Sequence, residues 1–178
     1  MKAIIEMTAG TLDKCEVDKT TGQLVVDRKL SVACPRNYGF LDNTLASDGD
    51  PLDVFVLCEP LPGLSQLEVV PIGVFICKDQ GVWDHKIVGV PFDGTTTSED
   101  RASAVQAIGS YLMTYKAGFE VLSYTEDILV VMRVLRNARL HRNRPVFEHE
   151  SLGWLRFASL LILAGLLALV GIFTGKHK

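Results

Sequence analysis

The sequence predicts an α+β fold that is mainly β, followed by one C-terminal hydrophobic helix. Three observations lead to this prediction. Residues 1–90 form short apolar and β-branched runs broken by Gly, Pro, Asn and Asp. Residues 98–140 carry apolar residues at helical spacing, and residues 157–175 are uncharged. At 178 residues the chain has room for one domain and an appendage.

Short segments with strand composition follow one another closely in the first half of the chain. Turn residues separate them: Gly22 in the stretch 18–23 predicts a hairpin loop, and 78–86 predicts a longer one. Such spacing is typical of a small barrel or sandwich. The predicted strands are 3–7, 14–18, 24–28, 54–57, 67–76 and 86–90.

Helical patterns begin after Pro91. Ser98 is a candidate N-cap followed by two acidic residues, and apolar residues recur every three or four positions across 104–115. A short strand over 119–124 precedes a second predicted helix over 126–140. Its sequence "ILVVM" also suits a strand, so that alternative stays open.

Composition limits the partners and the compartment. The formal net charge of -3 gives no reason to expect nucleic acid. The N-terminal "MKAIIEMTAG" has too short an apolar run for a signal peptide. The cysteines lack a C-x-x-C pair and are interpreted as reduced and structural, which favours the cytosol. They are Cys15, Cys34, Cys58 and Cys77.

The uncharged interval 157–175 is long enough to span a membrane. As a helix it would measure about 28 Å, close to the ~30 Å hydrocarbon core. Trp154 and Lys176 stand at its two ends as interfacial anchors. The sequence therefore predicts a transmembrane helix over 155–175, joined by a basic and polar linker over 141–154 to a domain over 1–140. A buried core or oligomer helix is the alternative.

The orientation of this predicted helix follows from the basic residues beside it. Arginines precede it and only two lysines follow it, so the positive-inside rule places the main domain in the cytoplasm, near anionic headgroups. A cytoplasmic protein without a tether is the alternative location. The arginines are Arg133, Arg136, Arg139, Arg142, Arg144 and Arg156.

Three carboxylates gather where a predicted strand begins. In "LASDGDPLDVFVL", Asp48 and Asp50 project to the same side of an extended chain, and Pro51 bends the chain so that Asp53 can join them. These acids repel one another and raise at least one pKa. A hard divalent cation such as Mg²⁺, which prefers oxygen ligands, removes the repulsion. A solvated acidic turn is the alternative.

Several segments resemble, in order, the motifs of the soluble family I inorganic pyrophosphatases. "DGDPLD" within "YGFLDNTLASDGDPLDVFVL" matches the family's D-x-D-P-x-D core. The resemblance covers roughly residues 4–140. Further similar segments are "KCEVDKTTGQLVVDR" at 14–28, "VPIGV" at 70–74, "KDQGVWDHKIVGVP" at 78–91 and "YK" at 115–116.

The resemblance implies a compact five-stranded (OB-like) barrel with flanking helices and Mg²⁺-dependent hydrolysis of pyrophosphate to two phosphates. It implies Asp50 as the general base that acts on a metal-activated water, with Glu6 in a supporting role. The implied Mg²⁺ ligands are Asp48, Asp53, Asp79, Asp84 and Glu16, and the implied phosphate-binding residues are Lys14, Arg28, Tyr38, Lys86, Tyr115 and Lys116.

The sequence also departs from the family pattern. Cys34 stands where the family commonly has Tyr, and the hydrophobic tail is not part of the pattern. Two alternatives stay open: a catalytically impaired pyrophosphatase-like scaffold or binding protein, and an enzyme for another phosphoanhydride such as a nucleotide. The resemblance to bacterial members of the family, which are hexamers, leaves a homo-oligomer open as well.

Overall fold

The computed structural model describes residues 1–93 and 101–143. The predicted helix over 155–175, the linker beyond 143 and the candidate cap Ser98 lie outside the described residues. The chain divides into two units, Met1–Asn143 and Arg144–Lys178, and the following description concerns the first. Within its described part, no helix is long and apolar enough to cross a membrane.

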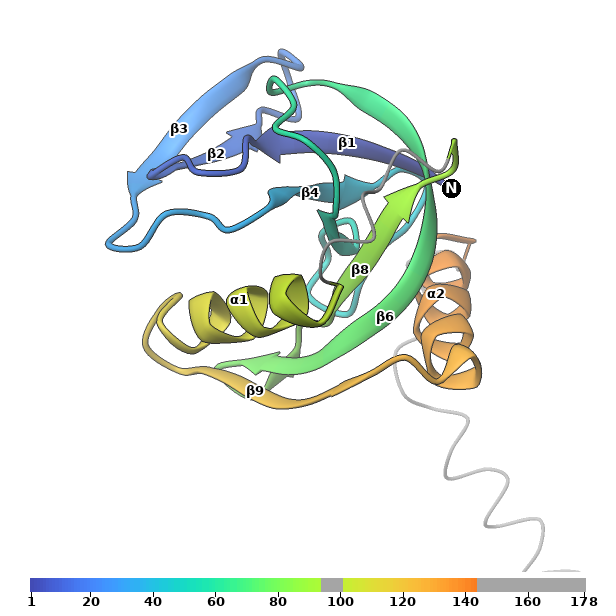
Figure 1. Ribbon diagram of the computed structural model, residues 1–178. Coiled ribbons are helices and arrows are strands. Elements are labelled where there is room, and N and C mark those ends of the chain that lie inside the picture. Colours follow the sequence, from blue (N-terminus) through green and yellow to red (C-terminus); the bar gives the residue numbers. More distant parts are fainter. Residues whose placement is uncertain (94–100, 144–178) are drawn as a thin grey trace, which may run out of the picture. The chain divides into compact units, whose positions relative to one another are not determined.

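Five strands close into a barrel through their backbone pairings, and Figure 1 labels most of them. β1 (Lys2–Met7) pairs antiparallel with β4 (Asn37–Leu41), and β4 pairs antiparallel with β5 (Asp53–Val56). β5 runs parallel to β8 (Lys86–Pro91). The long β6 (Gln66–Asp79) pairs with β8 and also with β1. This second pairing joins the two ends of the series, so the predicted five-stranded barrel is confirmed.

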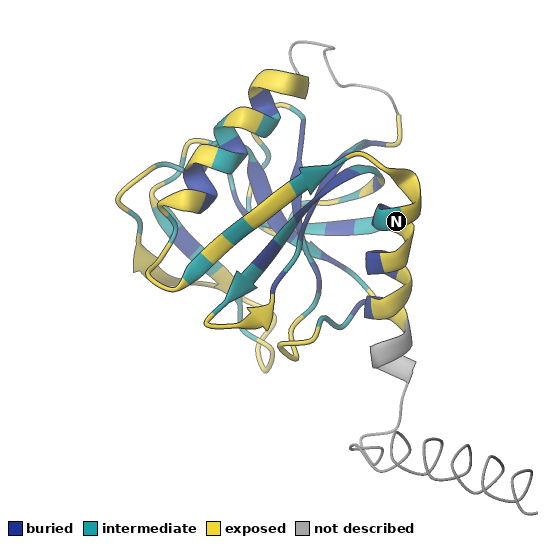
Figure 2. Cartoon of the chain, turned by 90° about the horizontal axis from the view of Figure 1, so that it is seen from below, coloured by how far each residue is buried: buried dark blue, intermediate teal, exposed yellow. Residues whose placement is uncertain are grey.

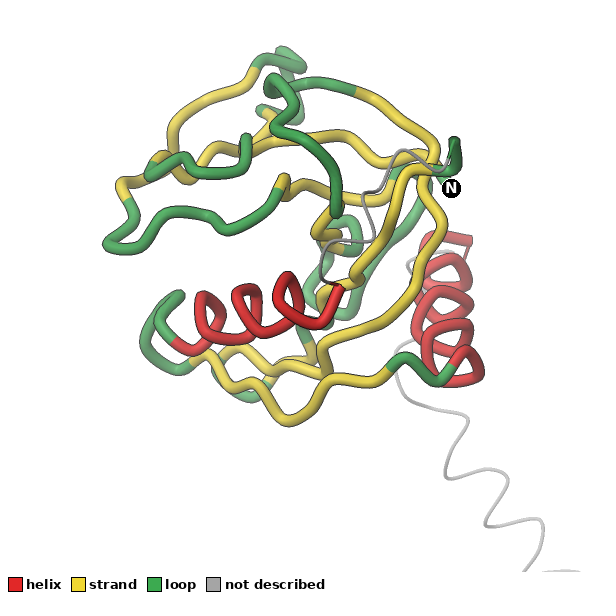
Figure 3. The backbone as a smooth tube through the Cα atoms, in the orientation of Figure 1, coloured by secondary structure: helices red, strands yellow, loops and turns green. Residues whose placement is uncertain are grey.

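Four further strands extend the barrel or lie beside it. β2 (Asp13–Val17) and β3 (Leu24–Lys29) form a separate antiparallel pair, whose turn contains Gly22 at a φ of 69°, as the predicted hairpin requires. β7 (Val82–Trp83) and β9 (Phe119–Thr125) pair with the C-terminal half of β6. Strands and loops make up most of the described unit, with helices at its sides (Figure 3).

β4 is a strand that the sequence analysis does not predict. Its residues are mostly buried, and it lies between β1 and β5. Gly39 interrupts its apolar pattern, yet the fold requires glycine there. A Cβ at this position would lie 1.9 Å from the carbonyl oxygen of Ile4 on β1. The close approach of the β1 and β4 backbones therefore explains why Gly39 occurs in this strand, although glycine makes the sequence less typical of a strand.

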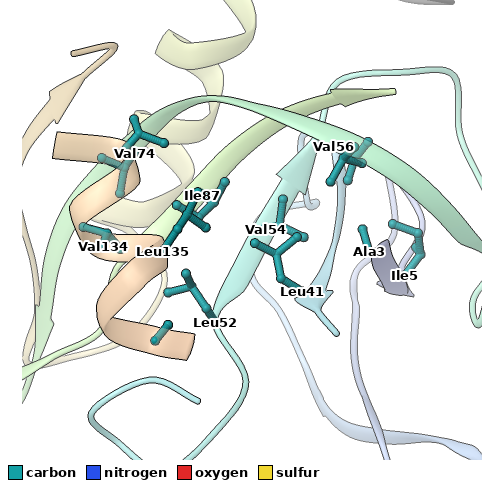
Figure 4. Close-up of a cluster of buried hydrophobic side chains, with 13 residues drawn as sticks. Ala3, Ile5, Leu41, Leu52, Val54, Val56, Val74, Ile87, Val134 and Leu135 are labelled. Carbon is teal, nitrogen blue, oxygen red and sulfur yellow. The ribbon is translucent and has the colours of Figure 1, made fainter. Parts of the chain in front are cut away.

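α2 (Ile128–Asn143) covers one end of the barrel core. This confirms the predicted helix over the competing strand, although the helix continues into the segment predicted as linker. Its buried residues recur at spacings of three and four and join the core that Figure 4 shows. The Ala138 carbonyl also accepts a 2.9 Å hydrogen bond from the Leu45 amide. The buried residues are Val131, Val134, Leu135 and Ala138.

α1 (Arg101–Met113) packs over a second group of buried side chains. Ile108 and Leu112 are almost fully buried there, together with Phe55 and Phe75 from the barrel. Buried residues occupy one side of the helix and exposed residues the other (Figure 2). The predicted spacing over 104–115 is confirmed, and the chain leaving α1 is directed towards the site described next.

Candidate active site

Lys86 is the most deeply buried cation of the predicted site residues. It begins β8, is 2% exposed and stands opposite Asp53 in the parallel pair with β5. Its ammonium group donates hydrogen bonds to Asp53 Oδ2 and, at 2.5 Å, to Asp84 Oδ1. Burial lowers the pKa of Lys86, but attraction to the two carboxylates outweighs it and raises the pKa above its ordinary value. Its charge is therefore retained in the interior.

Tyr38 stands beside this ion-paired group. It lies on β4, is 5% exposed, and its ring packs 4.9 Å from that of Phe55. Burial raises the pKa of Tyr38 well above its ordinary value, and the charge of Asp53 and a hydrogen bond to it add to the rise. The hydroxyl group is therefore a neutral hydrogen-bond donor near neutral pH.

Two cations face each other on the β2–β3 pair. Lys14 and Arg28 are directly opposite in register, although like charges in that position repel. Lys14 is 6% exposed and donates a 2.7 Å hydrogen bond to Glu16. Arg28 in turn lies 2.6 Å from Asp27 Oδ2, so each cation is paired with a carboxylate on its own strand. An anionic ligand would have to share or replace these partners.

Glu6 lies on β1 close to these groups. Its carboxylate accepts a 2.9 Å hydrogen bond from the Val17 amide. Burial raises the pKa of Glu6 to about 7, and the charges of Asp53 and Glu16 oppose ionisation further, while Lys14 partly offsets them. A carboxyl group that titrates near neutral pH at a polar site is typical of functional positions.

The segment after α1 supplies two more predicted residues. The guanidinium group of Arg28 lies 5.3 Å from the centroid of the Tyr115 ring. The Lys116 ammonium group donates a 2.6 Å hydrogen bond to Asp79 Oδ2 at the end of β6. The structure thus brings "YK" at 115–116 to β3 and to the hairpin that carries Asp79.

Asp48 and Asp50 lie on an exposed turn before β5. The Asp50 amide donates a 3.0 Å hydrogen bond to Asp48 Oδ1. Ser47 donates a 3.0 Å hydrogen bond to the carbonyl of Trp83, which connects this turn to the hairpin of β6 and β7. Partial burial raises the pKa of Asp48. The negative charges of neighbouring acids, first of all Asp84, add to this rise. Asp48 on the turn is therefore close enough to Asp84, the partner of Lys86, for their charges to interact.

The sequence analysis assigns no role to Lys19, which contacts the proposed base. Its ammonium group lies 2.5 Å from Asp50 Oδ1. Lys19 is the second lysine of "KCEVDK", a charged position of the family-like motif that could have drawn attention to it. The contact joins the β2–β3 loop to the acidic turn.

Cys34 is fully buried where the family pattern has a tyrosine. Its thiol donates to the Arg36 carbonyl at 3.1 Å, and burial raises its pKa to about 11. A hydrogen bond from Tyr111 partly lowers that pKa, and the Tyr111 ring lies 5.7 Å from that of Tyr115. Tyr111, predicted only as part of an apolar helix face, therefore brings a phenol beside Cys34. All the cysteines are free thiols, as predicted.

The predicted site residues form contacting groups of two to four side chains. Among described residues 1–93 and 101–143, no three acidic, histidine or cysteine side chains are grouped closely enough to hold a metal ion. Lysines contact several of the acids instead. The contacting sets are Asp53 and Asp84 with Lys86 and Tyr38, Lys14 with Glu16, Asp79 with Lys116, Arg28 with Tyr115, and Asp48 and Lys19 with Asp50.

The chemistry of these side chains fits a hard divalent cation. All the predicted ligands are carboxylates, which Mg²⁺ prefers. Asp79 Oδ1 is buried and has no hydrogen-bond partner in the described part of the chain, which leaves an oxygen lone pair for a ligand. The convergence of the carboxylates on one ion stays a prediction.

Comparison with known proteins identifies the relatives of this chain. The inorganic pyrophosphatase family model matches residues 3–123. An inorganic pyrophosphatase of Campylobacter jejuni is 38% identical over 127 residues, which are 65% of this chain and 74% of the relative. Soluble inorganic pyrophosphatase 2 of Chlamydomonas reinhardtii is 47% identical over 96 residues, or 52% of this chain and 50% of that protein.

A solved structure agrees in fold over most of the described unit. The inorganic pyrophosphatase from Helicobacter pylori superposes with a TM-score of 0.72 at 28% identity, covering 81% of this chain and 94% of that one. Across the curated relatives, this chain spans between about half and three quarters of their length. The similarity thus includes the strands that carry the site.

Proposed function

Since the chain belongs to the inorganic pyrophosphatase family, we propose that it hydrolyses inorganic pyrophosphate to two phosphates in a Mg²⁺-dependent reaction. The observation that carries this proposal is the buried ion-paired group of Lys86, Asp53 and Asp84, with the neutral hydroxyl of Tyr38 beside it. Burying a cation with two carboxylates costs desolvation free energy even when the charges are paired, and polar groups retained at such a cost are frequent at functional sites.

Mg²⁺ would be held by the acidic side chains that resemble the family's ligands. When bound, it would neutralise charge on the pyrophosphate and increase the acidity of water at the site. The buried, unpartnered Oδ1 of Asp79 supports this assignment. The proposed ligands are Asp48, Asp53, Asp79, Asp84 and Glu16.

The cations and phenols of the site would bind the phosphate groups. Lys14 and Arg28 supply adjacent positive charges on β2 and β3, which an anion between them would stabilise. Tyr38 keeps its proton and donates it in a hydrogen bond, because its pKa is raised. Lys86, Tyr115 and Lys116 complete the proposed set.

Asp50 would accept the proton of the attacking water. Its Oδ1 lies 2.5 Å from the Lys19 ammonium group, in an exposed ion pair on the acidic turn. The hydrogen bond from Ser47 to Trp83 connects this turn to the hairpin of Asp79 and Asp84. This connection supports a position for the proposed base beside the residues proposed to bind the substrate.

Phosphate release by the native chain tests this function. We expect release from pyrophosphate that requires Mg²⁺ and, when the free Mg²⁺ concentration is held constant, is not reduced by excess nucleoside triphosphate. Absence of Mg²⁺-dependent release would favour the scaffold alternative. Equal hydrolysis of the nucleotide would favour a broader phosphoanhydride hydrolase.

We also propose that a C-terminal helix over 155–175 tethers the enzyme to a membrane, with the Met1–Asn143 unit in the cytoplasm. Support comes from the sequence alone: residues 157–175 are uncharged and arginines precede them. Membrane fractionation checks the tether. Recovery of the full chain in the aqueous fraction without detergent would contradict it and favour a cytoplasmic enzyme.

A further inference from the structure

The outward side of α2 carries large apolar side chains in its first turns. Ile128, Leu129 and Met132 are 57%, 73% and 54% exposed. Surface helices of soluble proteins usually place polar residues in such positions. These three side chains form the apolar half of what we call the outer face of α2.

Arginines continue the same face towards the C-terminal end of the helix. Arg133, Arg136 and Arg139 are exposed. At helical spacing they follow Ile128, Leu129 and Met132 on the side away from the barrel. No aspartate or glutamate occurs in α2, and none of the three arginines forms an ion pair with another described residue. The outer face is therefore both apolar and positively charged.

The outer face of α2 does not pack against the barrel core. Val131, Val134, Leu135 and Ala138 provide the contacts of α2 with the core. Exposed residues of α2 lie on the opposite side (Figure 2). None of the proposed site residues is on this helix, so a partner on the outer face would not compete with substrate.

We propose that the outer face of α2 docks on the surface of a membrane that contains anionic lipid. Apolar side chains would enter the interface, while the arginines extend to the lipid phosphates. If the uncharged interval 157–175 spans a membrane as proposed, the 13 residues between Asn143 and residue 157 would keep α2 within reach of lipid. The inference rests on the proposed tether for this proximity, but concerns a separate contact made by the folded unit.

Other occupants match the face less well. In an isologous contact, which pairs this face with itself, the only acidic residues near the arginines would be Glu126 and Asp127 at the start of the helix, since α2 itself contains none. The uncharged C-terminal segment of the same chain could cover the apolar half but offers nothing to the arginines. Anionic lipid satisfies both halves.

Side-chain footprinting of the full chain with hydroxyl radicals tests the docking. The oxidation rate of Met132 is compared in phosphatidylcholine vesicles and in vesicles that also contain phosphatidylserine. Met113 on α1 is 74% exposed and serves as the internal control. We expect Met132 to be protected about fivefold or more in the anionic vesicles, since each basic residue near such a surface strengthens binding by about fivefold. Met113 should not change.

Two matched variants separate the contribution of charge from other effects. Arg136→Gln should weaken binding to the anionic vesicles by about fivefold and reduce the protection of Met132 accordingly, whereas Arg101→Gln, at an exposed arginine of α1, should leave it intact. High salt should likewise abolish the protection while the chain stays with the vesicles, because salt screens the arginines but not a transmembrane helix.

The outcomes distinguish this inference from the tether. Equal oxidation of Met132 in both kinds of vesicle overturns the docking, even if flotation shows the chain to be membrane-bound. Protection that depends on protein concentration and needs no vesicles also overturns it, in favour of a second copy. If flotation with neutral vesicles fails, the tether is wrong, and protection of Met132 by anionic vesicles still supports docking.

Discussion

At the level of single residues, removing the charge of Lys86 should lower the free energy of unfolding more than removing the charge of any other predicted site lysine. We expect Lys86→Met to lower the free energy of unfolding by about 3 to 5 kcal/mol, because Asp53 and Asp84 lose their buried counter-ion. Urea unfolding in a chelating buffer measures the loss. Lys116→Met is the matched control. Lys116 pairs with Asp79 at a more exposed site, so this substitution should lower the free energy of unfolding by less than about 1 kcal/mol. Equal losses would contradict the assigned role of burial.

Glu6 should make stability depend on pH in an unusual direction. Its pKa of about 7 in the folded chain exceeds the ordinary 4.5, so between these values the folded state holds a proton that the unfolded state releases. The free energy of unfolding should therefore fall as pH rises through this window, by at most about 3 kcal/mol.

The variant Glu6→Gln isolates this effect. Glutamine resembles the protonated acid and should remove the fall in stability that Glu6 contributes between about pH 5 and pH 8. Urea unfolding of the native chain and the variant across that range, without Mg²⁺, provides the comparison. The same slope in both proteins would show that Glu6 is not the responsible group.

The identities of the site residues could be predicted from the sequence, but their pairings could not. The motif singled out Asp53, Asp84 and Lys86, yet the ion pairs depend on the parallel register of β5 and β8. Lys19 was missed because its contact with Asp50 joins two loops that are far apart in the chain. Helical spacing predicts Tyr111 as a core residue, because spacing alone cannot reveal a neighbouring thiol.

At the level of elements, α2 should owe its position to its buried side chains. Leu135→Ala should lower the free energy of unfolding by about 2 to 5 kcal/mol, because Leu135 is 4% exposed within the barrel core. Leu129→Ala, on the outer face of the same helix, should change it by about 0.5 kcal/mol or less. Thermal or urea unfolding compares the two, and similar losses would contradict the observed orientation of α2.

The elements show which sequence signals sufficed. The hairpin at Gly22 and both helices were predicted correctly, because turn chemistry and helical spacing are local. β4 was missed because Gly39 breaks its apolar run for a reason that lies on β1, where Ile4 approaches it. The end of α2 was placed too early, since the polar residues after 140 resemble a linker but continue the helix to Asn143.

At the level of the whole molecule, the predictions of an inorganic diphosphatase and of its barrel are confirmed by the family and the solved relatives. That prediction rests on several charged motifs that occur in family order along the chain, and no single motif is specific enough to identify the family. The C-terminal helix lies outside the described residues and stays a proposal. The grouping of the acidic side chains around one ion also stays a prediction, because it depends on distances between side chains that the sequence does not contain.

Binding of Mg²⁺ should stabilise the folded chain. At a concentration of about 100 times the dissociation constant, the gain is about 2.7 kcal/mol, which calorimetry detects as a higher Tm. Asp79→Asn should reduce the gain, because it removes a carboxylate with a buried, unpartnered oxygen. Asp42→Asn, on a turn away from the proposed ligands, should preserve it. If Mg²⁺ leaves the Tm of the native chain unchanged, the acidic site is wrongly assigned.

The central claim, that the acidic turn supplies the general base of a pyrophosphatase, is tested most directly by phosphate release from pyrophosphate in Mg²⁺ by the native chain and Asp50→Asn. We expect the substitution to reduce the rate by about a hundredfold to ten thousandfold without loss of folding. Asp127→Asn is the matched control, since asparagine can still accept the capping hydrogen bond from the Leu129 amide, and it should keep the native rate. A rate for Asp50→Asn equal to that of the native chain would contradict the claim.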